Sequence, residues 1–300
     1  MKQLNNFLYT ASFGTKILLL VFVFAVMFII TTTLIFIISR SFPSLGERGL
    51  LIAGLTVQSI LLFICTPLIC AKILANSAID FLQAQKAPKL RQLLWCTVCM
   101  IVMTPAMNLI ITWNEGIHFP AALSGIENWM RNQEDAARVA TDMLLDTKSL
   151  WGVAGLILLV GVFTGIGEEF TFRGLIQRLV SEKSSNKHIA VWVTALLFSA
   201  IHIQFFGFFP RLLLGAFFGY MLVWSGNIWL PVFAHFLNNS VAAVSTFMID
   251  NKYTGDEFEK IGTIDNGTVW IAVISTVLFI LCTRELYKTC EADTKNSASV

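Results

Sequence analysis

The sequence predicts an all-α protein, a bundle of about eight helices that spans a membrane. The chain of 300 residues is 56% hydrophobic and only 13% charged, whereas soluble domains carry about 25% charged residues. The apolar residues also gather in runs, and a helix needs about 20 of them to cross a bilayer. Lipid is therefore the expected solvent. The predicted helices cover residues 16–38, 50–75, 92–113, 149–167, 188–208, 211–225, 228–248 and 268–283.

Tryptophans and cations support this set of helices. The first run is longer than the 7–15 apolar residues of a cleavable signal peptide, so we expect a retained helix. If the N-terminus is cytoplasmic and the helices alternate, 13 of the 21 lysines and arginines fall on the cytoplasmic side. That bias places both termini in the cytoplasm. Seven of the eight tryptophans lie near the ends of the runs, as is typical of a membrane interface: Trp95, Trp113, Trp151, Trp192, Trp224, Trp229 and Trp270.

The segments outside the apolar runs predict one further helix and a free tail. In the loop 114–148, Ser124 and Glu127 match a capping box, and an amphipathic pattern follows. We expect this helix to lie on the membrane surface or over a cavity. The polar residues 284–300 are expected to be disordered, and the net charge of +2 gives no reason to expect nucleic acid.

The cysteines predict no disulfide framework. Cys96 and Cys99 have a C-x-x-C spacing, but they lie in an apolar run with no second pair of ligands. Because a free cysteine packs as a small apolar residue, we expect both in the core.

Ionisable residues inside membrane helices are rare and mark functional sites by default. The first group is Glu168, Glu169 and Arg173. Glu169 and Arg173 are four residues apart on one helix face, in the order that favours an ion pair. Glu168 points about 100° away from Glu169, so it has no local partner and is free to take a proton. The alternative is that both acids belong to a structural ion-pair network.

Two further apolar helices carry polar groups. One holds His202, and the other holds His235 and Asn239, which are four residues apart and share a face. Each group needs partners, since unpaired burial costs several kcal/mol, and one shared cavity with water would satisfy them all. A carboxylate, two imidazoles and an amide around a water are the parts for general-base hydrolysis of a peptide.

Two other interpretations use the same residues. Glu168, His202 and His235 are a legitimate set of zinc ligands, but the sequence contains no H-E-x-x-H motif, and we expect no cofactor. A transporter with a proton relay would also use Glu and His. The chain shows no paired halves or repeated broken helices, which often mark transporters.

The three groups together resemble a known family. Glu168-Glu169-x-x-x-Arg173, Phe198-x-x-x-His202 and His235-x-x-x-Asn239 follow one another in this order. This pattern resembles the motifs of the CPBP family of type II CAAX prenyl endopeptidases and bacterial Abi proteins. The resemblance covers about residues 150–245, and it includes the spacing of Pro210, Gly215, Gly219, Gly226 and Pro231.

The resemblance implies an intramembrane endopeptidase of the bacterial inner membrane, with a conical catalytic cavity and a membrane-associated peptide or protein as substrate. Glu168 and His202 would activate water, while His235 and Asn239 would stabilise the intermediate. Glu169 and Arg173 would have a supporting role. The family has also been labelled metalloprotease, which keeps zinc open. The alternative function is a non-catalytic immunity or scaffold protein with the same fold.

The resemblance also divides the chain into three parts. Residues 1–148 would form N-terminal helices and the amphipathic loop helix, and residues 149–248 the catalytic core. Residues 249–300 would hold the last membrane helix and the polar tail. Substrate identity and oligomeric state do not follow from this division.

Overall fold

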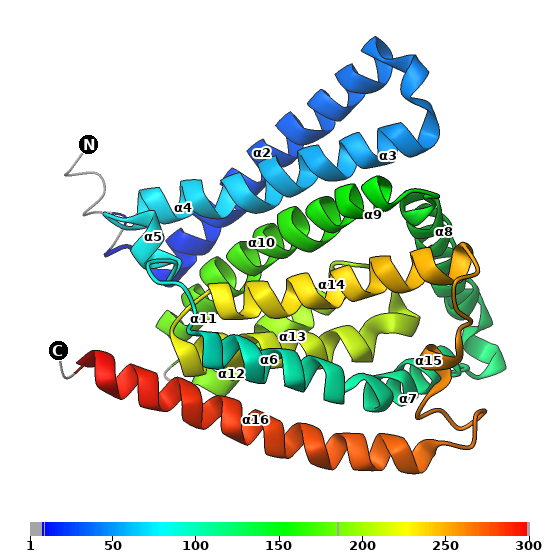
Figure 1. Cartoon of the computed structure of the whole chain (residues 1–300). Coiled ribbons are helices and arrows are strands. Elements are labelled where there is room, and N and C mark those ends of the chain that lie inside the picture. Colours follow the sequence, from blue (N-terminus) through cyan, green and yellow to red (C-terminus); the bar gives the residue numbers. More distant parts are fainter. Residues whose placement is uncertain (1–7, 9, 185, 299–300) are drawn as a thin grey trace.

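The protein is described by a computed structural model that covers residue 8 and residues 10–184 and 186–298, with side chains as far as residue 293. These residues form helices and no strand (Figure 1). The α-helices are α2 (Phe13–Ser41), α3 (Gly46–Val57), α4 (Thr66–Leu74), α5 (Ala78–Phe81), α6 (Leu90–Val102), α7 (Thr104–Glu115), α8 (Ser124–Leu145), α9 (Leu150–Leu156), α10 (Thr164–Glu169), α11 (Arg178–Lys183), α12 (Lys187–Ala200), α13 (Phe208–Ser225), α14 (Trp229–Asp250), α15 (Glu257–Lys260) and α16 (Val269–Ala298). Three π-helical stretches continue the long helices, η2 (Gln58–Cys65), η4 (Ile157–Phe163) and η5 (Phe170–Gln177), and three 3₁₀ turns lie at helix starts, η1 (Pro43–Leu45), η3 (Ala121–Leu123) and η6 (Phe205–Gly207).

The chain is an integral membrane protein with a polytopic helical bundle, as predicted. Within the described residues, six helices are long and apolar enough to cross a membrane, and α6 with α7 forms a seventh that bends by 45°. Pro105 lies in the first turn of α7, where its ring and missing N–H interrupt the helix and account for the bend. The fifth predicted run, 188–208, is helical only as α12, which ends at Ala200.

One long helix runs through the middle of the bundle. It consists of α9, η4, α10, η5 and α11 and extends from Leu150 to Lys183. It packs against α14 on one side and against η2 on another, while α12 and α13 pack along each other beside it. This arrangement surrounds the middle of the long helix with protein, so polar side chains there can find polar partners.

The two ends of the bundle differ. The start of α2 and the end of α16 lie at the same end as α5 and α11, and α8 covers the opposite end (Figure 1). An ion pair of 2.7 Å between Lys16 and Glu182 joins the start of α2 to α11. The shared end of the first and last helices is compatible with both termini on one side of the membrane.

The amphipathic helix is present as α8, but the predicted capping box is wrong. Ser124 is the first residue of the helix and makes no capping bond. Glu127 instead reaches back beyond the helix start and accepts a hydrogen bond of 2.8 Å from the backbone N–H of Phe119. Arg131 donates to the same carboxylate, so the acid fixes the incoming loop.

The prediction of a disordered tail is also wrong for most of its length. Helix α16 continues to Ala298. Leu286 and Cys290 are completely buried against Cys96 and Cys99, and Lys89 pairs with Asp293 at 2.6 Å. Two apolar side chains at helical spacing are enough to keep this polar segment packed on α6. Cys96 and Cys99 are free thiols in the core, as predicted.

Candidate active site

The two glutamates lie on a short α-helical stretch between two π-helical ones. Helix α10 has six residues and is flanked by η4 and η5. A π-helical turn widens the helix and changes the direction of side chains, and such turns are frequent at functional sites. Close contacts fix α10 in place. A methyl group on Gly167 would lie 2.8 Å from Phe63 Cβ and 3.1 Å from the carbonyl oxygen of Ser59, so glycine permits this approach to η2.

Glu169 forms the centre of a buried cluster. Its Oε1 accepts 2.8 Å hydrogen bonds from Nη1 of Arg173 and from Nδ1 of His235. The side chains of Glu169 and Arg173 are both 0% exposed, and that of His235 is 6% exposed. The ion pair with Arg173 confirms the predicted interaction, whereas the contact with His235 joins two motifs that the sequence left separate.

A row of contacts fixes the helix of the glutamates against α13. Arg173 Nη2 donates to the carbonyl oxygen of Gly215 at 2.9 Å, and Gln177 Nε2 donates to that of Gly219 at 3.1 Å. On each of the two helices the second contact lies four residues after the first, so the helices run in the same direction and stay in register. Small residues four apart let helix backbones approach closely in membranes, and here they expose the carbonyl oxygens to the two donors.

Glu168 is the partly accessible acid of the site. Its side chain is 15% exposed, and its Oε2 lies 3.6 Å from Nε2 of His235. Because the Glu169 carboxylate can only accept, His235 Nδ1 carries a proton, and Nε2 faces Glu168 either with a lone pair or with a second proton. Glu168 and His235 therefore lie within ion-pair distance of each other, although 3.6 Å is too long for a hydrogen bond.

His202 lies beyond the end of its helix, which corrects the prediction. Helix α12 ends at Ala200, and His202 occupies the following turn. Its Nδ1 lies 2.7 Å from the carbonyl oxygen of Phe198. A carbonyl oxygen only accepts, so Nδ1 carries the proton and Nε2 presents a lone pair. His202 and His235 both contact the ring of Phe198, and His202 lies within electrostatic range of Glu168.

Asn239 extends the row of polar groups on α14. Its Nδ2 donates to the carbonyl oxygen of Val160 at 2.8 Å, and its Oδ1 accepts from Asn238 at 3.2 Å. One of its two amide hydrogens is thus used inside the protein, and the second is left for another acceptor.

The described residues offer no group of three or more His, Cys, Asp or Glu side chains arranged to hold a metal ion. The Nδ1 atoms of both histidines are bound to protein acceptors, which leaves the Nε2 atom of each ring for another ligand. The zinc alternative stays a prediction.

Two polar residues of the site were not predicted. Asn114 on α7 is buried; it donates to the carbonyl oxygen of Phe205 at 3.2 Å and accepts from the N–H of Phe209 at 2.9 Å, so it fixes the loop that follows His202. Arg211 is the one charged side chain within α13 and lies within electrostatic range of Glu168 and His202. The rarity of charge in a membrane helix is the signal by which sequence reasoning could have found Arg211.

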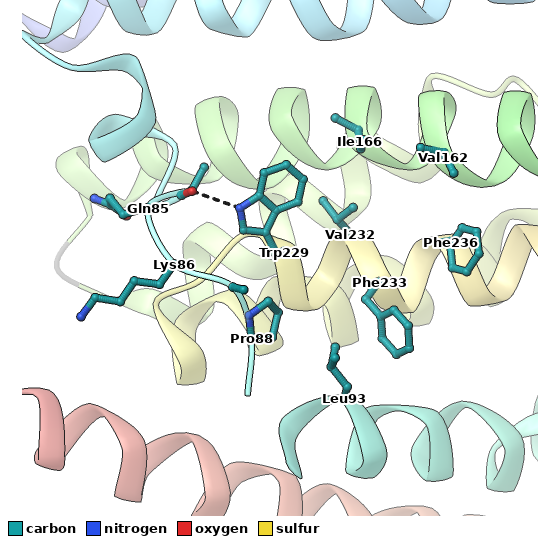
Figure 2. Close-up of a pocket in the computed structure, with 12 residues that line it drawn as sticks. Gln85, Lys86, Pro88, Leu93, Val162, Ile166, Trp229, Val232, Phe233 and Phe236 are labelled. Carbon is teal, nitrogen blue, oxygen red and sulfur yellow. Dashed lines mark hydrogen bonds between the residues drawn. The ribbon is translucent and has the colours of Figure 1, made fainter. Parts of the chain in front are cut away.

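An apolar groove runs along the long helix and α14, the two helices that carry the glutamates and His235, and none of these three side chains lines it (Figure 2). It has a volume of about 420 Å³ and lies between the segment 84–88, α6, the long helix and α14. Trp229 closes one side of it through a 3.1 Å hydrogen bond from its ring N–H to Ala84. The residues that line it include Ile166, two positions before Glu168, and Val232 and Phe236, which flank His235.

The fold and the site thus define a polytopic membrane protein with a glutamate–histidine cluster at the middle of its bundle. Residues 150–241 match the family model of the type II CAAX prenyl endopeptidase Rce1-like proteins. The matched segment covers less than half of the chain, and it contains all three motifs, which confirms the predicted resemblance to this family.

A curated protein also matches part of the chain. The uncharacterized protein YpbD of Bacillus subtilis (strain 168) is 29% identical over 91 residues, which are 29% of this chain and 43% of YpbD. The match spans less than half of the length of YpbD. No solved structure matches the chain.

Proposed function

We propose that the protein is an intramembrane endopeptidase that hydrolyses a peptide bond of a membrane-associated protein or peptide with water activated by Glu168 and His202. The observation that supports this proposal most strongly is the different fate of the two glutamates. Glu169 is fully buried and neutralised by Arg173, whereas Glu168 keeps 15% of its side chain exposed and has no cationic side chain other than His235 within 4 Å among the described residues.

The proposed reaction begins with water between Glu168 and Nε2 of His202. Glu168 takes a proton from the water, and the water oxygen forms a bond to the substrate carbonyl carbon while the carbonyl oxygen becomes an oxyanion. The spare amide hydrogen of Asn239, and Nε2 of His235 when it is protonated, donate to that oxyanion. The C–N bond then breaks, and the leaving nitrogen receives the proton, which gives a carboxylic acid and an amine.

The buried cluster of Glu169, Arg173 and His235 has an electrostatic function. Because Arg173 balances Glu169, the pair adds no net charge next to Glu168. Glu169 also fixes the orientation of the His235 ring through Nδ1, so Nε2 stays directed at the position of the oxyanion. We propose that an apolar part of the substrate lies in the groove beside Ile166, since its lining is apolar and it borders both helices of the site.

The test compares cells that contain the wild-type protein with cells that contain Glu168→Gln. Membrane peptides and newly formed C-termini are identified by mass spectrometry, and the purified variants are checked for folding. Peptides that depend on Glu168 support the proposal. If the cellular effect of the protein persists in folded Glu168→Gln and no peptide changes, the protein is a non-catalytic immunity or scaffold factor. Sensitivity of the activity to chelators decides whether zinc takes part.

We further propose that the protein lies in a bacterial inner membrane with both termini in the cytoplasm. The cation distribution supports this orientation. The test introduces single cysteines at the two ends of the bundle, one at the start of α2 and one in α8, and measures their accessibility to labelling in intact cells.

A further inference from the structure

Arg211 is a half-buried cation that the mechanism above does not use. It lies in the first turn of α13, and its Nη1 donates to the carbonyl oxygen of Gln204 at 3.2 Å. Among the described residues, no carboxylate oxygen lies within the 4.0 Å of an ion pair with it, although Glu134 and Glu168 both act on it electrostatically. An arginine held in a membrane helix without an ion pair is costly, so its position calls for a functional explanation.

The register of the helices places Arg211 at the level of the glutamates. Arg173 contacts Gly215 and Gln177 contacts Gly219, and the two helices are parallel. One turn back along each helix, this register brings Arg211 to the level of Glu169. Arg211 and Gly215 are four residues apart and therefore share the face of α13 that is turned toward the site.

The loop after His202 keeps the guanidinium in this place. A methyl group on Gly207 would overlap Nη2 of Arg211, so the guanidinium rests directly on the backbone of Gly207. The loop itself is fixed by Asn114, which bonds to Phe205 and Phe209, and by Glu134, which accepts from the N–H of Phe206 at 3.1 Å. Arg211 is thus held on the same loop that carries His202.

Without Arg211, the site offers an oxyanion only two donors among the described residues, the second amide hydrogen of Asn239 and Nε2 of His235 when it is protonated. His235 Nδ1 is used by Glu169, and one amide hydrogen of Asn239 is used by Val160. An oxyanion in a water-poor site is stabilised best by fixed charges and donors that need no reorganisation. The guanidinium has five N–H groups, and a single bond to Gln204 leaves several of them for a ligand.

We propose that Arg211 is a further catalytic residue, which donates to the carbonyl oxygen of the scissile peptide bond and stabilises the negative charge that develops there. This inference rests on the proposed peptidase function. The competing explanation is that Arg211 only fixes the loop through Gln204. The two explanations differ in whether the loss of Arg211 changes kcat or the stability of the protein.

The test uses the full-length protein in detergent micelles with fluorescein-labelled casein as the probe substrate. For Arg211→Gln we expect kcat to fall about 100-fold, which is the effect of losing one oxyanion donor, with KM within twofold and the unfolding temperature unchanged. Arg211→Lys should keep part of the activity, since it keeps the charge. Gly207→Ala should lower kcat as well, because the added methyl group displaces the guanidinium without removing it.

Arg178→Gln is the matched control. Arg178 also donates to a backbone carbonyl, that of Phe81, but it lies at the α11 end, away from the glutamates. It should leave kcat unchanged. Wild-type kcat in folded Arg211→Gln, or a rise in KM alone, overturns the assignment while the proposed peptidase function stands. If the wild-type protein cleaves neither casein nor any membrane peptide, the function itself fails, and the inference fails with it.

Discussion

His235 Nδ1 donates a hydrogen bond of 2.8 Å to Oε1 of Glu169, and through this contact one motif fixes the orientation of another. The same oxygen accepts from Arg173. Two donors from two helices, Arg173 and His235, thus share one buried carboxylate oxygen, while Glu168, one residue before Glu169, remains outside this cluster. The neighbouring glutamates should therefore respond differently to the same substitution.

Glu168→Gln should abolish cleavage and preserve the fold. Removal of a general base lowers rates by about 10² to 10⁴-fold, and the partly exposed Glu168 loses only its 3.6 Å contact with His235. Glu169→Gln should instead destabilise the protein, because it leaves Arg173 as an unpaired buried charge, at a cost of about 3–5 kcal/mol. Thermal unfolding in detergent together with a cleavage assay separates the two effects. Equal stability loss in both variants would contradict this assignment of roles.

Glycine at position 167 should be essential for packing, and glycine at position 155 should not. A methyl group at Gly167 meets Phe63 Cβ at 2.8 Å and the Ser59 backbone at 3.1 Å, whereas at Gly155 nothing lies within 4 Å. We expect Gly167→Ala to destabilise the protein by about 1–3 kcal/mol through overpacking. Gly155→Ala should be neutral, or stabilise by up to about 1 kcal/mol. Unfolding temperatures of the two variants decide the matter, and an equally stable Gly167→Ala protein would refute the close approach.

The sequence could predict features that depend on composition and on spacing within one helix. The apolar runs predicted the membrane helices, and the interval of four residues predicted the pair of Glu169 and Arg173. Contacts between helices were beyond its reach, because they depend on how the helices are rotated and shifted against each other. The bond from His235 to Glu169 is such a contact, and so are those of Arg173 and Gln177 with the carbonyl oxygens of α13.

The errors of the sequence-based predictions have local physical causes. His202 was expected within a helix because the apolar run continues to residue 208, but apolar residues also fill the loop around Phe205 and Phe206, which packs under α8. The tail was expected to be disordered because its average polarity is high. Leu286 and Cys290 outweigh that average, since both face the core at helical spacing.

The groove of Figure 2 should affect the entry of substrate rather than the chemistry. Val162 lines it on the long helix, and Val162→Trp should fill much of its volume of about 420 Å³. We expect cleavage of a membrane-anchored substrate to slow about tenfold, equivalent to about 1.4 kcal/mol, mainly through KM. Val241→Trp is the control, because Val241 is 65% exposed on α14 and should have no effect. Unchanged cleavage by both variants would show that substrate does not use the groove.

The carboxylate of Glu127 should make the anchoring of α8 dependent on pH in the acidic range only. The N–H of Phe119, and next to it Arg131, lower the pKa of Glu127 from about 4.5 to about 2. A lowered pKa in the folded state stabilises the protein fully above the unfolded value, and that contribution is lost as the pH falls from about 4.5 toward 2. Hydrogen exchange of the α8 amides should therefore be slower in the wild type than in Glu127→Gln from pH 5 upward, by an amount that does not change with pH.

The difference between the two proteins should shrink below about pH 4, as the wild-type carboxylate gains its proton. Asp135→Asn serves as the control, because the Asp135 side chain is 63% exposed and pairs with Arg138 at the surface, where an ion pair contributes about 0–1 kcal/mol. Exchange in α8 that is equally slow in wild type and Glu127→Gln at pH 7 would show that the helix is held by its apolar contacts, such as Trp129 against Phe205. In that case the loop after His202 would keep its position without the charge on Glu127.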